Sequence, residues 1–219
     1  MESAGGWDRD SEVDVYTRNL WNLGKVGMDF RKGKADIISI QKFLSAIILD
    51  DSPNKDEAAH YLNSRGPITV QPNTANMNGF MAWLRDNSIP MQNIDGVNQQ
   101  LHSNPPILLD SESVLRAYKS GRDMFVYTTM RILKVDVQGL QGKKVEYMSI
   151  PYKWCTGYAF ETAGPILDKD VEVYNYTDVS SLRVIKQSIL VKHCDVYEVA
   201  YFVNMLRRKE HRNRQNWIC

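Results

Sequence analysis

The sequence contains few of the residues and patterns that usually carry chemistry. Cysteine is rare among the 219 residues, and its positions show neither the spacing of zinc ligands nor a disulfide framework. They are Cys155, Cys194 and Cys219. No segment has the charged and then apolar pattern of a secretory leader. We therefore expect a reducing compartment, cytoplasmic or nuclear, and no secretion.

Long apolar runs are also scarce. The longest, IISIQKFLSAIIL over residues 37–49, is interrupted by polar side chains and is shorter than the roughly 20 residues that a membrane-spanning helix needs. The chain opens Met-Glu-Ser and ends on Cys219, so the standard myristoyl and prenyl signals are missing. We expect no transmembrane segment, and any membrane contact would be peripheral, at the inner face.

Patterns for nucleotide and metal binding are missing as well. Neither the dinucleotide-binding nor the P-loop glycine pattern occurs, and the nearest approach, GLQGKK over residues 139–144, has the composition of a hairpin turn. The histidines are scattered, without the one-turn spacing that lets two imidazoles hold one metal ion. We therefore predict no cofactor and no metal site.

One cysteine is a candidate nucleophile. Cys155 lies in the aromatic segment PYKWCTGYAF, and folding could bring His102 or His193 to it as the base. A small buried thiol is the more common role of such a residue. We expect a non-enzymatic protein, and keep a cysteine-dependent hydrolase or transferase using Cys155 as an alternative.

Periodic segments are present and predict the fold. The first half is mainly helical by this criterion, with apolar residues recurring every three or four positions most clearly from residue 36 to 49. Further predicted helices span residues 11–23, 52–64, 78–87 and 111–118, and much of 67–106 is expected to be loop.

The second half has strand composition. Residues 123–137 are dense in β-branched and aromatic side chains, and 145–150 resume after turn residues, which predicts a hairpin. Three further strands are expected within residues 157–192, followed by a helix capped by Asp195 and Glu198. The predicted class is α+β: a helical N-terminal half packed on a mainly antiparallel sheet, closed by a C-terminal helix with a basic tail.

These segments suggest boundaries along the chain. We predict a mainly helical part over residues 1–106, a β-rich part with the terminal helix over 107–206, and a basic tail over 207–219. One single domain overall remains an alternative, because the length suits either arrangement.

The basic tail is the strongest functional signal. The net charge is +1, yet five basic residues and one acidic residue give residues 207–214 a charge of +4, so the remainder carries about −3. The predicted binding residues are Arg207, Arg208, Lys209, Arg212, Arg214 and Trp217. Such a cluster favours an anionic partner, either nucleic acid or an anionic membrane surface. The alternative is that these cations only stabilise the helix dipole and keep the helix soluble.

Helices packed on a β-rich half, a basic segment and the lack of a catalytic motif together resemble the plan of matrix and related structural proteins of RNA viruses. The resemblance covers most of the chain and implies self-association into a homo-oligomer, contact with a nucleoprotein complex and attachment to the inner membrane face. A viral accessory RNA-binding protein, such as a movement protein or silencing suppressor, is an alternative, as is the enzyme using Cys155.

Overall fold

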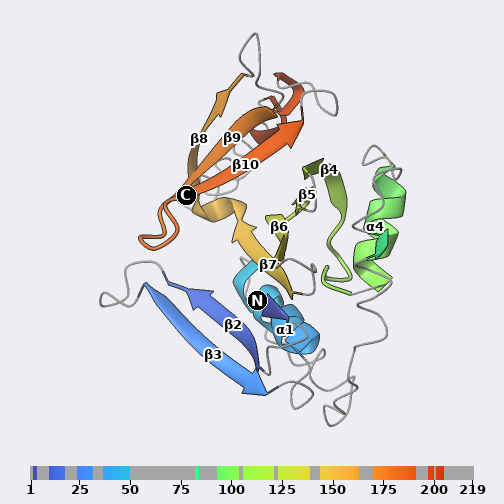
Figure 1. The fold of residues 1–219 in the computed structure, drawn as a ribbon, viewed down its shortest axis with the longest axis vertical. Helices are drawn as coiled ribbons and strands as arrows, with labels where there is room; N and C mark the ends of the chain where they lie inside the picture. Colours follow the sequence, from blue (N-terminus) through green and yellow to red (C-terminus); the bar gives the residue numbers. More distant parts are fainter. Residues whose placement is uncertain are drawn as a thin grey trace, which may run out of the picture. The chain divides into compact units, whose positions relative to one another are not determined.

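A computed structural model describes twelve stretches of the chain (Figure 1). They are residues 2–3, 10–17, 24–31, 37–49, 82–83, 93–103, 106–120, 123–138, 144–162, 170–190, 197–199 and 201–204. The chain divides into two compact units. Unit 1 comprises Met1–Asp14, Gly27–Ala117 and Gly121–Ser149, and unit 2 comprises Val15–Val26, Tyr118–Ser120 and Ile150–Cys219.

The larger sheet has seven strands in the order β3-β2-β1-β7-β6-β5-β4. Its strands are β1 (Glu2–Ser3), β2 (Asp10–Tyr16), β3 (Lys25–Arg31), β4 (Val114–Ser120), β5 (Asp123–Thr128), β6 (Arg131–Gln138) and β7 (Lys144–Pro151). β1 joins the N-terminal strands to the rest, because it pairs antiparallel with both β2 and β7. Strands that are more than a hundred residues apart in the sequence therefore share one sheet.

The alternation of side chains along β6 places the core of unit 1. Leu133, Val135 and Val137 are buried, whereas Lys134 and Asp136 between them are only partly buried. Helix α4 (Ile94–Ser103) contributes Val97 and Leu101 to the same core, and helix α1 (Ile37–Leu49) packs Ile38 against it. The other core residues are Ile107, Leu108, Val114, Ala117, Met124, Val126, Val145 and Tyr147.

Unit 2 is built on a three-stranded antiparallel sheet in the order β10-β9-β8 (Figure 1). Its strands are β8 (Cys155–Glu161), β9 (Asp170–Thr177) and β10 (Val184–Leu190), and the short helix η1 (Tyr152–Trp154) precedes them. Val173 and Ile185 lie on the buried face, and Tyr174 and Lys186 on the outer face. Residues 197–199 and 201–204 are helical and bury Val199, Phe202 and Val203.

Several sequence predictions are confirmed. The helix at 36–49 is α1, the three strands within 157–192 are β8 to β10, and the described residues of the C-terminal helix are helical. The helix predicted at 52–64 lies outside the described residues, and of the one at 78–87 only 82–83 are described, as helical.

The predicted helical N-terminal half is wrong, and so is the α+β plan built on it, because most described elements are antiparallel strands. Residues 11–23 were expected to form a helix, but Asp10–Tyr16 is a strand. In DSEVDVY, Val13 and Val15 alternate with polar residues, which is the pattern of a strand. This segment forms a strand because it can pair with β1.

Three further differences have local causes. The helix expected at 111–118 is a turn followed by β4, because Glu112 is held by a buried ion pair. The strand expected at 123–137 is two strands, since Thr128 Oγ1 accepts from the N–H groups of Met130 and Arg131 and closes a tight turn. Helix α4 lies where mostly loop was expected; Asn93 caps its N-terminus by accepting from Gly96 N–H.

Candidate functional site

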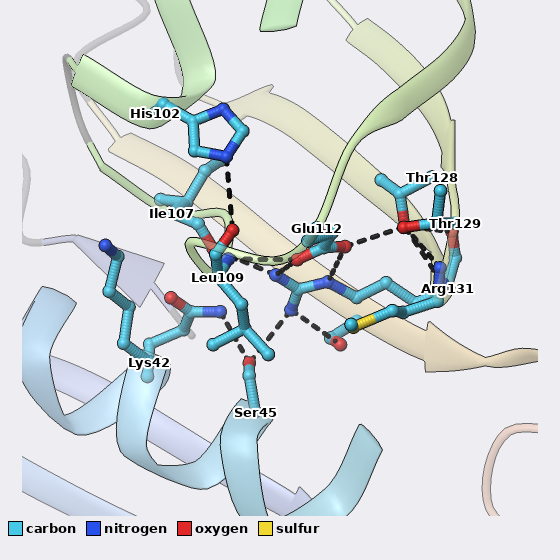
Figure 2. A network of polar contacts seen from close by, with 12 residues as sticks. Lys42, Ser45, His102, Ile107, Leu109, Glu112, Thr128, Thr129 and Arg131 are labelled. Carbon is cyan, nitrogen blue, oxygen red and sulfur yellow. Dashed lines mark hydrogen bonds and ion pairs between the residues drawn. The ribbon is translucent and has the colours of Figure 1, made fainter. Parts of the chain in front are cut away.

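A buried ion pair between Arg131 and Glu112 lies at the centre of a network of polar contacts in unit 1 (Figure 2). Both side chains are 0% exposed, and they form two parallel hydrogen bonds of 2.8 Å, Nε to Oε1 and Nη2 to Oε2. The remaining guanidinium N–H groups donate to Ile107 O at 2.9 Å, Ser45 Oγ at 2.9 Å and Ser149 Oγ at 3.0 Å. All five donors of this arginine are therefore used.

The carboxylate of Glu112 is equally saturated. Besides Arg131, it accepts from Leu109 N–H at 3.1 Å and from the Thr128 hydroxyl at 2.7 Å. The network thus joins helix α1, the 107–112 loop, the β5–β6 turn and β7. Since every charged atom is occupied by protein partners, the network has a positioning role and offers no group to a substrate.

The network holds an exposed turn in place. Asp110, at the tip, is 88% exposed and lies 3.6 Å from the Nζ atom of Lys42, which is buried on α1. On the other side, one ring nitrogen of His102 lies 2.8 Å from Asn98 O. The other lies 3.1 Å from Leu109 O, the contact drawn in Figure 2. The 107–112 loop is therefore fixed from both α1 and α4.

The predicted nucleophile and base are engaged elsewhere. Both ring nitrogens of His102 contact backbone carbonyls of unit 1, and the Sγ atom of Cys155 lies 3.8 Å from the carbonyl of Pro151 in unit 2. Neither contact is that of a nucleophile with its base. His193 lies outside the described residues, among which no group of three metal-ligating side chains occurs.

The predicted binding residues of the tail, Arg207, Arg208, Lys209, Arg212, Arg214 and Trp217, also lie outside the described residues. Their role stays a prediction from charge.

An exposed aromatic surface on unit 2 was missed by sequence reasoning. Tyr197 and Tyr201 are 73% and 72% exposed and lie one helical turn apart, on the side opposite the buried Val199 and Val203. The ring of Phe160, itself partly exposed, meets that of Tyr197 edge-on at 6.5 Å and 76°. We call Phe160, Tyr197 and Tyr201 the aromatic surface. The signal was present in the sequence, because both tyrosines fall between the positions of the predicted apolar stripe.

The outer face of the three-stranded sheet carries a paired polar cluster. Lys186 Nζ lies 2.5 Å from Glu172 Oε1, and the Tyr174 hydroxyl is shared between carboxylate oxygens of Glu172 and Glu161, at 2.5 and 2.9 Å. The hydrogen bond from Lys186, then that from Tyr174, lowers the pKa of Glu172. The bonds to Glu172 and then Glu161 raise the pKa of Tyr174. The charged and polar atoms of this cluster are therefore hydrogen-bonded to one another.

Two carboxylates face each other on β5 and β6. The register that pairs Met124 with Val135 sets Asp123 opposite Asp136, whose carboxylate lies 3.2 Å from Lys134 Nζ. Burial, and then the charge of Asp136, raises the pKa of Asp123. The pair is a source of strain in the folded state at neutral pH.

Among the helices in the described part of the chain, none is both long and apolar enough to cross a bilayer.

Comparison with known proteins identifies the family. The model for the family described as "Bacterial PH domain" matches residues 86–205, from just before α4 to the C-terminal helix. The uncharacterised protein YjqA of Bacillus subtilis is 45% identical over 97 residues, which make up 44% of this chain and 74% of YjqA.

Two solved structures are also similar. A pleckstrin-homology-domain protein of the DUF1696 family from Shewanella loihica is 34% identical and covers 52% of this chain and 93% of its own, with a TM-score of 0.45. A pleckstrin homology domain from Shewanella amazonensis is 32% identical and covers 59% of this chain and 98% of its own, also with a TM-score of 0.45.

The family match and the similarity to YjqA overturn the interpretation as a viral matrix-like structural protein. The nucleoprotein contact and the accessory RNA-binding role that went with it lose their basis. PH domains are generally non-catalytic modules that mediate protein or lipid interactions, which also gives the Cys155 enzyme no support. With a family model that matches more than half of its length, the chain belongs to the bacterial PH-domain family.

Proposed function

We propose that the protein is a non-catalytic interaction module that docks peripherally on an anionic membrane surface through its C-terminal end. The observation that carries this proposal is the aromatic surface, in which two tyrosines on one side of a helix are nearly three-quarters exposed. Tyrosine is enriched at interaction surfaces, and aromatic side chains that gather on one exposed surface indicate a binding site.

Tyrosine suits the head-group region of a bilayer. Its ring is apolar and its hydroxyl forms hydrogen bonds, so it lies readily between lipid tails and water. Tyr197 and Tyr201 project from the same side of the helix, and Phe160 extends the apolar area next to Tyr197. The aromatic surface can therefore supply the salt-insensitive part of the binding.

The sequence that follows supplies the charge. The basic residues begin six positions after Tyr201, and residues 207–214 carry a net charge of +4. A basic residue near an anionic membrane contributes about 1 kcal/mol, and the attraction is screened by salt within a Debye length. This charge favours an anionic lipid surface over a protein as the partner of the aromatic surface.

Vesicle co-sedimentation of the full chain tests the proposal. We expect binding to phosphatidylcholine vesicles that contain phosphatidylglycerol and little binding to phosphatidylcholine alone. Replacing Arg207, Arg208 and Lys209 with glutamine should weaken binding on the order of 100-fold at low salt, because about 3 kcal/mol is lost. Tyr197→Ser/Tyr201→Ser should weaken binding at high salt as well.

Tyr176→Ser is the matched control, because Tyr176 is also an exposed tyrosine of unit 2 but lies on the outer face of β9. It should leave binding unchanged. Equal binding to neutral and anionic vesicles, or wild-type binding by the triple glutamine variant at low salt, would overturn the proposal. Capture of a protein partner without any vesicle binding would also overturn it.

A further inference from the structure

Helix α1 is packed with its polar side inward. Gln41, Lys42 and Ser45 are buried, whereas Ile47 is 50% exposed. The other large apolar residues on the side of Ile47 are Ile40, Phe43, Leu44 and Ile48, and all are only partly buried. We call these five residues the apolar side of α1. A helix of a globular protein normally shows the reverse arrangement.

The cause of the inversion is the buried ion pair. Ser45 Oγ accepts from Arg131 at 2.9 Å and from Gln41 Nε2 at 2.8 Å, and Lys42 lies 3.6 Å from Asp110. These contacts turn the polar side of α1 toward the protein. The apolar side, with residues at i, i+3, i+4, i+7 and i+8, forms a continuous stripe of the kind that packs against another helix.

The charges that flank α1 in the sequence identify the occupant of this stripe. Arg31, Lys32 and Lys34 precede the helix and outnumber Asp36, while Asp50 and Asp51 follow it directly. In an antiparallel pair of α1 helices, the basic end of one meets the acidic end of the other, and the helix dipoles oppose each other favourably. A parallel pair would place like charges together.

We propose that the apolar side of α1 is a self-association face, on which two copies of this chain pair their α1 helices antiparallel about a two-fold axis. A two-fold interface uses the same patch on both copies, as this one does. Helix α1 precedes the family-matched residues 86–205, so the face belongs to the segment before the PH domain. The proposal is independent of membrane docking by the C-terminal end.

Sedimentation velocity over a concentration series tests self-association. One helix pair buries less than the roughly 1,200 Å² of a standard stable interface, so the wild type should form a dimer that dissociates on dilution. Ile47→Ser changes an exposed position and should preserve folding while raising the dimer dissociation constant about tenfold. Val184→Ser, at an apolar position that is 49% exposed, should leave it unchanged. A wild type that stays monomeric throughout would overturn the proposal.

Charge reversal tests the antiparallel orientation. Asp50→Lys/Asp51→Lys should weaken the dimer, and Lys32→Glu/Lys34→Glu in the same chain should restore it, because both ends of each contact are then reversed. If the combined variant is no better than Asp50→Lys/Asp51→Lys, the antiparallel contact is wrong.

Cross-linking locates the axis. In a chain whose three cysteines are serine, Leu44→Cys, near the centre of the stripe, should form a disulfide with its own copy. The Ile40→Cys chain should cross-link mainly to the Ile47→Cys chain when the two variants are mixed, and each should cross-link poorly to its own copies. Efficient cross-linking of Ile40→Cys and Ile47→Cys each with itself would indicate a parallel pair. If Ile47→Ser loses vesicle binding while its sedimenting mass equals that of the wild type, a membrane covers this face. Either this result or the parallel cross-linking pattern would overturn the proposal.

Discussion

Replacing Arg131 with methionine removes one partner of the buried ion pair and leaves the other in place. Methionine fills similar space along β6 but has no donor, so Glu112 would stay in a site with 0% exposure without its cation. Two hydrogen bonds to Glu112 survive, one from the backbone N–H of Leu109 and one from the hydroxyl of Thr128. They reduce the penalty but do not neutralise the carboxylate.

Truncating one partner of a buried ion pair costs about 3–5 kcal/mol. Ile107 O also loses a donor, yet such contributions are not additive, so we expect Arg131→Met to lower the free energy of unfolding by about 4 kcal/mol. With an m value of about 2 kcal/mol per molar urea, the midpoint would shift by about 2 M. Arg131→Met/Glu112→Leu should cost less than Arg131→Met alone, because no buried charge is then left unpaired.

Urea titration followed by tryptophan fluorescence measures these differences. Lys134→Met is the matched control, because Lys134 lies on the same strand and forms a partly exposed ion pair with Asp136 at 3.2 Å. This pair is 22% and 24% exposed and is joined by a single hydrogen bond, so breaking it should cost less than breaking the fully buried pair. Destabilisation of Arg131→Met no greater than that of Lys134→Met would refute the view that the network holds unit 1 together.

Three further predictions concern single side chains. The pKa of Asp123 is raised above its ordinary value of 3.8 in the folded state, so the stability of the wild type falls as the pH rises from about 3.8 through the folded-state pKa. Asp123→Asn should therefore melt at a higher temperature than the wild type at pH 7, and this advantage should vanish at about pH 3. Lys186→Met should raise the pKa of Glu172 in an NMR titration, since the bond from Lys186 is the main cause of its lowered value. Cys155→Ser should leave the melting temperature and vesicle binding unchanged; loss of vesicle binding without loss of folding would restore a functional role for this thiol.

The sequence predicted elements whose pattern is satisfied locally. Apolar residues at helical spacing gave α1, and dense β-branched and aromatic residues gave β8 to β10. It failed where distant partners decide the structure. Asp10–Tyr16 fits a helix or a strand by its pattern, and becomes a strand in a sheet where β1 links it to β7, more than a hundred residues later.

The candidate sites show the same limit. Nothing near Arg131 in the sequence marks it, because Glu112 is 19 residues away and Ser45 is 86 residues away. The basic tail was visible as charge alone and stays a prediction. The aromatic surface could have been predicted, since Tyr197 and Tyr201 fall outside the apolar stripe of a helix that was expected correctly.

Membrane docking by the C-terminal end is tested most directly by the tyrosine ring signals in an NMR spectrum with vesicles that carry a paramagnetic label at the head group. The ring signals of Tyr197 and Tyr201 should broaden strongly on anionic vesicles, and that of Tyr176, on the outer face of β9, should stay sharp. Equal broadening of all three tyrosines, or broadening confined to Tyr176, would contradict the account.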